Sequence, residues 1–161
     1  MSLADLDISK NLITDIGLKA LAQALSGNNS LKFLNMASNK CKEEGFVDFA
    51  ELLKTNTALV EVSFGMNIIS NEGLGFLAQM LPHNKTLQHL DLSRNSFNDT
   101  GFEEFAELMT HNEGLVFLDI AKNKDVTDEG SLVTLVDALM LNKTLKTLDL
   151  TGLNVRKPFL K

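Results

Sequence analysis

Internal repetition constrains this chain more than any other feature of its sequence. Leucines recur every 28 residues, with a final interval of 30, at Leu3, Leu31, Leu59, Leu87, Leu115 and Leu145. Each opens the pattern L-x-x-L-x-L-x-x-N or a close variant, as in LADLDISKN and LQHLDLSRN. A glycine follows the asparagine by six residues in four copies and by seven in the fifth. Self-similarity at a period of about 20–50 residues predicts stacked structural units.

The two halves of each unit have different apolar periods. Alternation in the LDL segment at 90–92 predicts a half-buried strand. After the glycine the spacing becomes three and four, as in Leu18, Leu21 and Leu25, which predicts one apolar face of a helix. An N-cap acceptor is expected two residues before the glycine, at Asp15, Asn71, Asp99 and Asp128.

One such unit cannot bury its own apolar face, so neighbouring units must stack. We expect a single α/β domain over 1–161, with repeats at 3–30, 31–58, 59–86, 87–114 and 115–144 and a partial repeat at 145–161. Strands lie about 4.8 Å apart and helices no closer than about 8 Å, so the stack bends. The result is a short solenoid with a parallel sheet on the concave face and helices on the convex face.

The repeat resembles the ribonuclease-inhibitor-like leucine-rich repeats. The resemblance is carried by L-x-x-L-x-L-x-x-N, by the glycine, and by the helix segments LAQAL and LAQML. Such repeats also occur in NOD-like receptors, Ran GTPase-activating proteins, tropomodulins and many bacterial effectors. The resemblance implies a right-handed horseshoe; it does not imply the inhibitor's activity, because one fold hosts many functions.

Two sets of asparagines recur with the repeat. The motif asparagines can satisfy backbone groups left unpaired as each strand turns away, because an amide both donates and accepts. We expect them to form a structural column: Asn11, Asn39, Asn67, Asn95 and Asn123. A second asparagine lies in each helix-to-strand turn, and there Asn84 is expected to be exposed.

The concave face carries the candidate binding residues. Residues on either side of the second motif leucine must point out of the sheet. The first outward column is Asp5, Phe33, Glu61, His89, Phe117 and Thr147, and the second is Asp7, Asn35, Ser63, Asp91, Asp119 and Asp149, bordered by Lys10, Met66, Arg94 and Lys122. The predicted protein-binding set is Phe33, Asn35, Glu61, His89, Asp91, Arg94, Phe117, Asp119, Lys122 and Asp149.

Within this set the two phenylalanines and the aspartates stand out. Phe33 and Phe117 break the polar pattern of a solvated sheet face and are candidate anchors, although isolated exposed apolar residues are also common. The aspartate column at 91, 119 and 149 places like charges about 4.8 Å apart. Their repulsion favours a basic partner group, or the nearby Arg94 and Lys122. The alternative is that aspartate is an ordinary residue of the L-D-L-S version of this repeat.

Sequence motifs and net charge exclude several functions. No nucleophile, phosphate-binding or metalloprotease motif is present, and His83 and His111 lie in equivalent turns with no third metal ligand. We therefore expect no enzymatic activity, cofactor or metal. The formal charge of −6 argues against nucleic acid and anionic membranes as partners. The single cysteine and the absence of a signal-peptide pattern favour the cytoplasm.

The expected function is a protein–protein interaction module that binds a partner, with a basic patch, through its concave sheet. A regulator of the GTPase-activating type is one alternative. A structural fragment of a larger receptor, effector or cytoskeletal protein is another. Neither terminal repeat carries a recognisable polar cap, so the chain is expected to belong to a longer array or to self-associate end to end.

Overall fold

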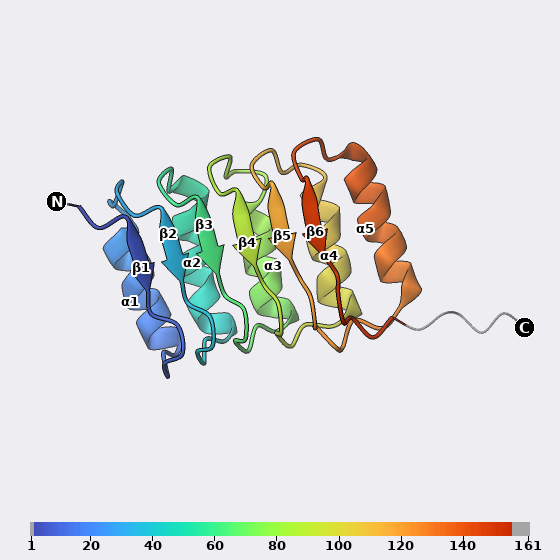
Figure 1. The fold of residues 1–161 in the computed structure, drawn as a ribbon, viewed down its shortest axis with the longest axis horizontal. Coiled ribbons are helices and arrows are strands. Elements are labelled where there is room, and N and C mark those ends of the chain that lie inside the picture. The colour runs from blue at the N-terminus through green and yellow to red at the C-terminus, as the bar shows by residue number, and fades with distance from the viewer. Residues whose placement is uncertain (1, 156–161) are drawn as a thin grey trace, which may run out of the picture.

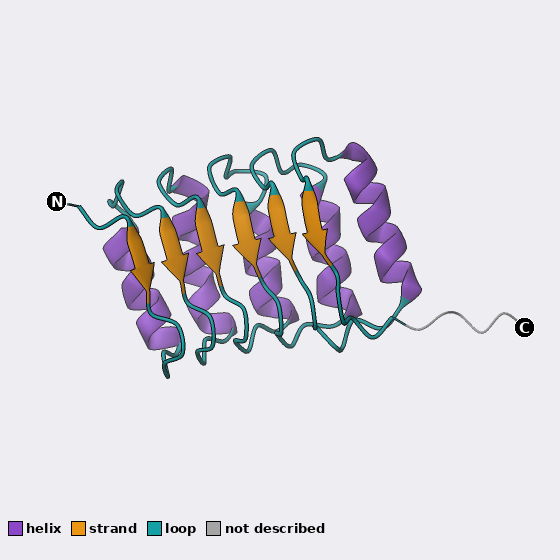
Figure 2. Cartoon of the chain, viewed as in Figure 1, coloured by secondary structure: helices purple, strands orange, loops and turns teal. Residues whose placement is uncertain are grey.

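The computed structural model describes residues 2–155 of the chain. Over this range strands and helices alternate as two layers, with the sheet in front and the helices behind it in Figure 1 and Figure 2. The strands are β1 (Asp5–Asp7), β2 (Phe33–Asn35), β3 (Glu61–Ser63), β4 (His89–Asp91), β5 (Phe117–Asp119) and β6 (Thr147–Asp149). The helices are α1 (Asp15–Leu25), α2 (Glu43–Thr55), α3 (Asn71–Met80), α4 (Asp99–Met109) and α5 (Glu129–Leu141).

The six strands form one parallel sheet in the order β1 to β6, so neighbours in sequence are neighbours in space. The register pairs equivalent residues of successive repeats: Asp91 of β4 lies opposite Asp119 of β5, which lies opposite Asp149 of β6. Each helix packs against the helices of adjacent repeats. This arrangement confirms the α/β repeat solenoid predicted from the sequence.

The core lies between the sheet and the helices. Motif leucines such as Leu34, Leu90 and Leu118 are buried beneath the strands. In the centre, Phe64 meets Phe46 and Phe49 of α2 edge-to-face, with ring centroids 4.9 and 5.0 Å apart. The apolar helix residues are packing residues: Phe46, Phe102 and Met80 are fully buried, and Phe76 is partly buried against the core.

The recurring glycine marks a close approach between neighbouring helices. A Cβ at Gly101, in the first turn of α4, would lie 2.8 Å from Cα of Asn71 in the first turn of α3. That distance is shorter than real Cβ contacts, and backbone cannot move aside as a flexible side chain could. Glycine therefore allows the starts of these two helices to touch.

Three of the four predicted N-cap residues are not N-caps in the structure. Asp15, Asn71 and Asp99 are the first residues of their helices, and the N-caps stand one position earlier, at Thr14, Ser70 and Asn98. Only Asp128 is the N-cap that was predicted, its side chain accepting from the Gly130 amide.

Two of the aspartates predicted as N-caps accept hydrogen bonds from the next repeat instead. Oδ1 of Asp15 accepts from the Lys42 and Gly45 amides at the start of α2, at 2.7 and 3.2 Å. Likewise Oδ1 of Asp99 accepts from the Asp128 amide at 3.0 Å. Each side chain reaches along the stack because the next helix begins within its range with unpaired amides.

Apolar side chains are exposed at both ends of the stack. At the first repeat these are Leu3, Leu12 and Ile16, and on α5 they are Val133, Val136, Met140 and Leu141. Helices α1 to α4 carry a buried alanine at one recurring position, at Ala22, Ala50, Ala78 and Ala106. The corresponding residue of α5 is Val136, which is 55% exposed. Within the described residues, none of the helices combines the length and apolarity needed to cross a membrane.

Candidate protein-binding groove

The outward columns of the sheet line a continuous hollow on the face opposite the helices. A cavity of about 500 Å³ spans β1 to β5 and is lined by Asp5, Asp7, Phe33, Leu34, Asn35, Glu61, Ser63, Asp91, Phe117 and Asp119. A smaller cavity of about 310 Å³ shares its β3–β5 side and adds His89. We call these two cavities together the concave groove. Its lining contains five carboxylates and, among the described residues, no lysine or arginine.

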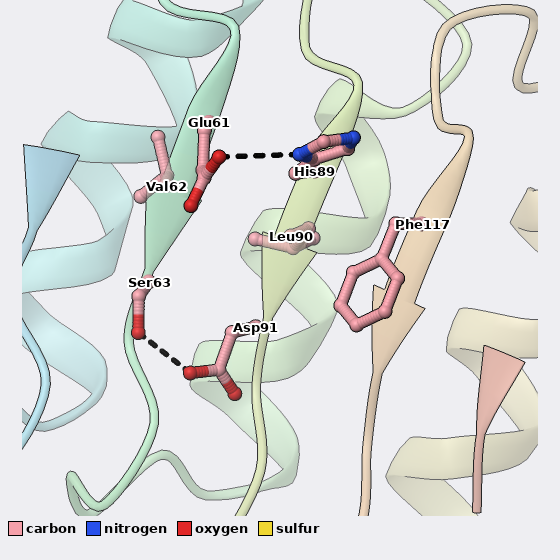
Figure 3. Close-up of a pocket in the computed structure, with 7 residues that line it drawn as sticks. All are labelled: Glu61, Val62, Ser63, His89, Leu90, Asp91 and Phe117. Carbon is pink, nitrogen blue, oxygen red and sulfur yellow. Dashed lines mark hydrogen bonds and ion pairs between the residues drawn. The ribbon is translucent and has the colours of Figure 1, made fainter. Parts of the chain in front are cut away.

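The first column of the groove contains a row of contacts across three strands. Nδ1 of His89 lies 3.1 Å from Oε2 of Glu61, and the His89 ring meets the Phe117 ring edge-on at 5.8 Å. Figure 3 shows the Phe117 ring reaching from β5 toward β4. Phe33, two strands away from His89, is 43% exposed. The groove therefore presents two aromatic rings: Phe117, which contacts His89, and Phe33, which is exposed to solvent.

The side chains of the second column have a structural role in the turns after the strands. One oxygen of each acidic or amide side chain accepts from the backbone amide two residues later. The distances are 2.9 Å for Asp91, 2.8 Å for Asp119 and 2.8 Å for Asp149. Asn35 makes the same bond to the Ala37 amide at 3.0 Å. An acceptor at this position holds the turn that ends each strand, which explains why aspartate recurs there.

The second carboxylate oxygens distinguish these aspartates from one another. Oδ2 of Asp7 accepts from Asn35 at 3.1 Å, and Oδ2 of Asp91 accepts from the Ser63 hydroxyl at 2.6 Å (Figure 3). Over residues 2–155, Asp119 accepts only from the Ala121 amide, whereas Asp149 accepts from the Thr151 amide and side chain. Asp119 thus keeps one oxygen available on the open side of the sheet.

Burial and neighbouring charge act on Asp119 in particular. Burial raises the pKa of the Asp119 carboxyl, and the charges of Asp91 and Asp149 raise it further, against the Ala121 amide and Lys122. By contrast, hydrogen bonds from Thr151 lower the pKa of Asp149. Asp119 is therefore a half-buried acid held between two like charges, which a nearby cation would stabilise.

The basic residues of the predicted set lie outside the groove. Arg94 and Lys122 adopt left-handed backbone conformations, with φ of 55° and 61°, in the turns after β4 and β5. They line a separate hollow of about 700 Å³ together with Asn95, Lys124, Asp125 and Gly152. In the described part of the chain, neither forms an ion pair with Asp91, Asp119 or Asp149. The structure does not bring the predicted set together at one point.

The motif asparagines lie in the turns that follow the strands. Nδ2 of Asn67 donates to the Met36 and Phe64 carbonyls at 3.0 and 3.1 Å, and its Oδ1 accepts from the Cys41 amide at 3.1 Å. Asn39, Asn67 and Asn123 are buried, Asn95 is partly buried and Asn11 is exposed. These bonds tie each repeat to the one before it.

The expectation that Asn84 is exposed is wrong. Asn84 is only 3% exposed and makes four hydrogen bonds: it donates to the Leu53 and Asn56 carbonyls and accepts from the Thr86 and Leu87 amides. The turn asparagines form a second structural column of the same kind: Asn28, Asn56, Asn84, Asn112 and Asn142. A polar turn residue looks exposed in one repeat, but the neighbouring repeat covers it.

Two histidines lie in equivalent turns of neighbouring repeats. His83 and His111 are exposed in the turns after α3 and α4. No group of three His, Cys, Asp or Glu side chains within residues 2–155 is arranged to hold a metal ion.

Comparison with known proteins agrees with this fold. A family model described as "Leucine Rich repeat" matches residues 1–22 and 83–106. A search of curated proteins finds no match. A solved structure described as "Leiomodin-1 Actin-Binding Site 2 (ABS2)" is similar with a TM-score of 0.70 and 20% identity, over 86% of this chain and 79% of that one. The tropomodulin C-terminal domain of Caenorhabditis elegans also has a TM-score of 0.70, with 13% identity, over 86% of this chain and 83% of that one.

Fold and repeat together define the class. The chain has a leucine-rich-repeat fold, and its repeat resembles the ribonuclease-inhibitor-like type, as the sequence indicated. Its strand-and-helix stack is similar to the C-terminal repeat domains of tropomodulin and leiomodin.

Proposed function

We propose that this chain is a non-enzymatic, cytoplasmic protein-binding module that receives its partner in the concave groove. The observation that carries the proposal is the pairing of aromatic and acidic side chains, exposed or half-buried, on one face of the sheet. Phe33 and Phe117 lie in a hollow whose other outward side chains are polar. Buried aromatic anchors surrounded by polar groups are typical of binding hot spots. The strands position these residues without any loop having to order first.

A photo-crosslinking experiment tests where the partner binds. A photoreactive phenylalanine analogue is placed at Phe33 or Phe117, and in a matched variant at Val47, an exposed residue of α2 on the convex layer. In the native cells, a discrete protein adduct is expected from the two groove positions and not from position 47. Adducts formed only from position 47 would move the interface to the helices and overturn the proposal.

The identified partner then allows a direct affinity measurement. We expect the double variant Phe33→Ala, Phe117→Ala to weaken binding at least about 30-fold, because hot-spot truncations cost about 2 kcal/mol or more. The thermal unfolding midpoint should change little, since both side chains are at least partly exposed. Titration calorimetry and a thermal melt of the same samples give the two results. Unchanged affinity would contradict the groove as the binding site.

Two further functions have defined assays. The similar leiomodin structure is described as an actin-binding site, which makes actin the first candidate partner to test by co-sedimentation with filaments. A GTPase-activating role predicts stimulated GTP hydrolysis when the chain is added to a GTPase. Stimulated hydrolysis would replace the binding-module proposal with a regulator of catalysis in trans.

Self-association through the ends of the stack is a separate proposal. It is supported by the exposed apolar side chains around β1 and on α5, and by the outer edges of β1 and β6, which pair with no strand among residues 2–155. Light scattering after gel filtration should show a mass that rises with concentration. Leu6→Lys or Leu148→Lys should abolish the rise with helix content retained, whereas Val47→Lys, on the convex layer, should not. A monomer at all concentrations would contradict end-to-end packing.

A further inference from the structure

We propose that the exposed face of α5 is a dimer interface, at which two copies of the chain pack α5 against α5 in antiparallel orientation. This inference rests on the proposal of self-association and deepens it, because it assigns the contact to one helix and to a closed pair of chains. The residues around β1 take no part in this contact.

The outer face of α5 carries an apolar stripe. Figure 1 shows α5 as the last helix of its layer. Val133, Val136 and Met140 are each more than half exposed among the described residues. Their spacing of three and four residues places them on one side of the helix. The end of a solenoid that faces water is normally polar, so an exposed apolar stripe at this place indicates a protein contact.

The stripe lies on the side of α5 that points to the next position in the stack. The residue equivalent to Val133 in α1 is Lys19, whose Nζ lies 3.2 Å from Oδ2 of Asp48 in α2. The residue equivalent to Val136 in α1 is Ala22, which lines a cleft together with Asp48. In the earlier repeats, the following helix therefore occupies the place that is open beside α5.

The size of Val136 indicates what kind of helix can fill this place. Helices α1 to α4 have a buried alanine at the equivalent position. A further repeat helix at the same distance would collide with the two additional methyl groups of Val136. Because the distance between packed helices depends on the side chains at the contact, the helix that covers α5 must lie farther away than the repeat spacing. A helix from a second chain is free to do so.

The stripe is complementary to itself in an antiparallel pair. With the two-fold axis at Val136, this residue meets its own copy, and Val133 meets Met140 of the partner subunit. Glu129 then lies opposite Lys143 of the partner subunit, because both are equally far from Val136 along the chain. Glu129 and Lys143 are exposed, and neither forms an ion pair within residues 2–155. Opposite charges at the two ends of the stripe favour this orientation over a parallel one, which would pair like charges.

Charge disfavours the alternative of head-to-tail stacking. A sheet continued from β6 to β1 of the next copy in the same register would place Asp149 opposite Asp7. Like charges directly opposite one another on neighbouring strands are destabilising. An open chain of stacked copies is therefore less favourable than a closed pair.

The α5 contact is small, so we expect a weak dimer. A helix of 13 residues is about 20 Å long and about 10 Å wide, which is well below the roughly 800 Å² per partner of a stable complex. Sedimentation equilibrium of the full chain, up to about 1 mM, should show a mass that rises toward twice the monomer mass and does not exceed it.

Cysteine cross-linking tests the position of the two-fold axis. Val136→Cys places a thiol beside its own copy, and copper phenanthroline as the oxidant should join the two chains by a disulfide. Val47→Cys, exposed at the position of α2 equivalent to Val133, is the matched control, and the native Cys41 is fully buried. We expect at least about tenfold more linked dimer from Val136→Cys, because a disulfide requires Cα atoms within about 7 Å of each other. Equal yields from the two variants would overturn the proposal.

A charge exchange tests the antiparallel orientation. Glu129→Lys alone and Lys143→Glu alone should each weaken the dimer at least about threefold, since each creates two repulsive contacts across the axis. The double variant Glu129→Lys, Lys143→Glu should recover the original affinity. Losses that add in the double variant would contradict the antiparallel pair.

The outcomes separate this inference from self-association in general. A mass that grows beyond the dimer, and is reduced by Leu6→Lys but not by Val136→Lys, would keep end-to-end association and overturn the α5 interface. A monomer at all concentrations would contradict both. A monomer whose thermal unfolding midpoint falls strongly in Val136→Lys would show that the chain itself covers α5, which also overturns the inference.

Discussion

Phe64→Ala is expected to destabilise the protein by about 3–5 kcal/mol, the usual cost of emptying a buried phenylalanine site. Phe64 follows β3 and is fully buried between Phe46 and Phe49 of α2. Its ring therefore joins one repeat's strand to the preceding repeat's helix. Because each repeat in a solenoid is stabilised mainly by its neighbours, a cavity in the middle of the stack weakens both halves. Guanidinium denaturation followed by circular dichroism measures the loss.

Phe117→Ala is the matched control for this change. It removes the same group from β5, but on the open face of the sheet, and is expected to cost less than about 1 kcal/mol since little core is lost. Equal costs for Phe64→Ala and Phe117→Ala would show that Phe117 is a packing residue, which would also count against the groove. A cost below about 1 kcal/mol for Phe64→Ala would mean that the cavity collapses without penalty.

Asn84→Ala is expected to cost about 1–3 kcal/mol or more, as each buried backbone group left without a partner carries a penalty of that order. Asn84 joins the end of α2 and the turn after it to its own turn, by donating to the Leu53 and Asn56 carbonyls and accepting from the Thr86 and Leu87 amides. Asn67→Ala should have a comparable effect, because Asn67 is buried and bonds the Met36 carbonyl and Cys41 amide of the preceding repeat and the Phe64 carbonyl of its own. Chemical denaturation of both variants under identical conditions provides the comparison.

Asn11→Ala provides the control for the asparagines. Asn11 opens the motif column, is exposed, and donates only to the Ile8 and Ser9 carbonyls of its own turn. Water can replace the amide there, so a loss of only about 0.5 kcal/mol or less is expected. If Asn84→Ala costs no more stability than Asn11→Ala, the burial of the turn asparagines does not stabilise the protein.

The period of the leucines was sufficient to predict the solenoid and the strand register. Leu34, Leu90 and Leu118 can be buried only if the residues beside them point outward, so the 28-residue spacing already placed Asp91 beside Asp119. Repetition makes this possible because each unit meets the same surroundings, and a pattern within one repeat predicts contacts in all of them. The aromatic and acidic columns of the groove follow from the same alternation of side chains across a strand.

Only the tertiary structure decided which polar side chains form hydrogen bonds and which groups are their partners. Asn84 appears as a turn residue in its own repeat, yet the preceding repeat buries it. Asp15 was expected to cap the helix of its own repeat, but it is the first residue of α1 and accepts from amides at the start of α2. Asp91 and Asp119 are alike in sequence, but Ser63 occupies the second oxygen of Asp91 alone. The partners in these hydrogen bonds lie 27 to 31 residues apart along the chain. Whether such a bond forms depends on which residue stands at the partner position, and the repeat period alone does not determine that residue.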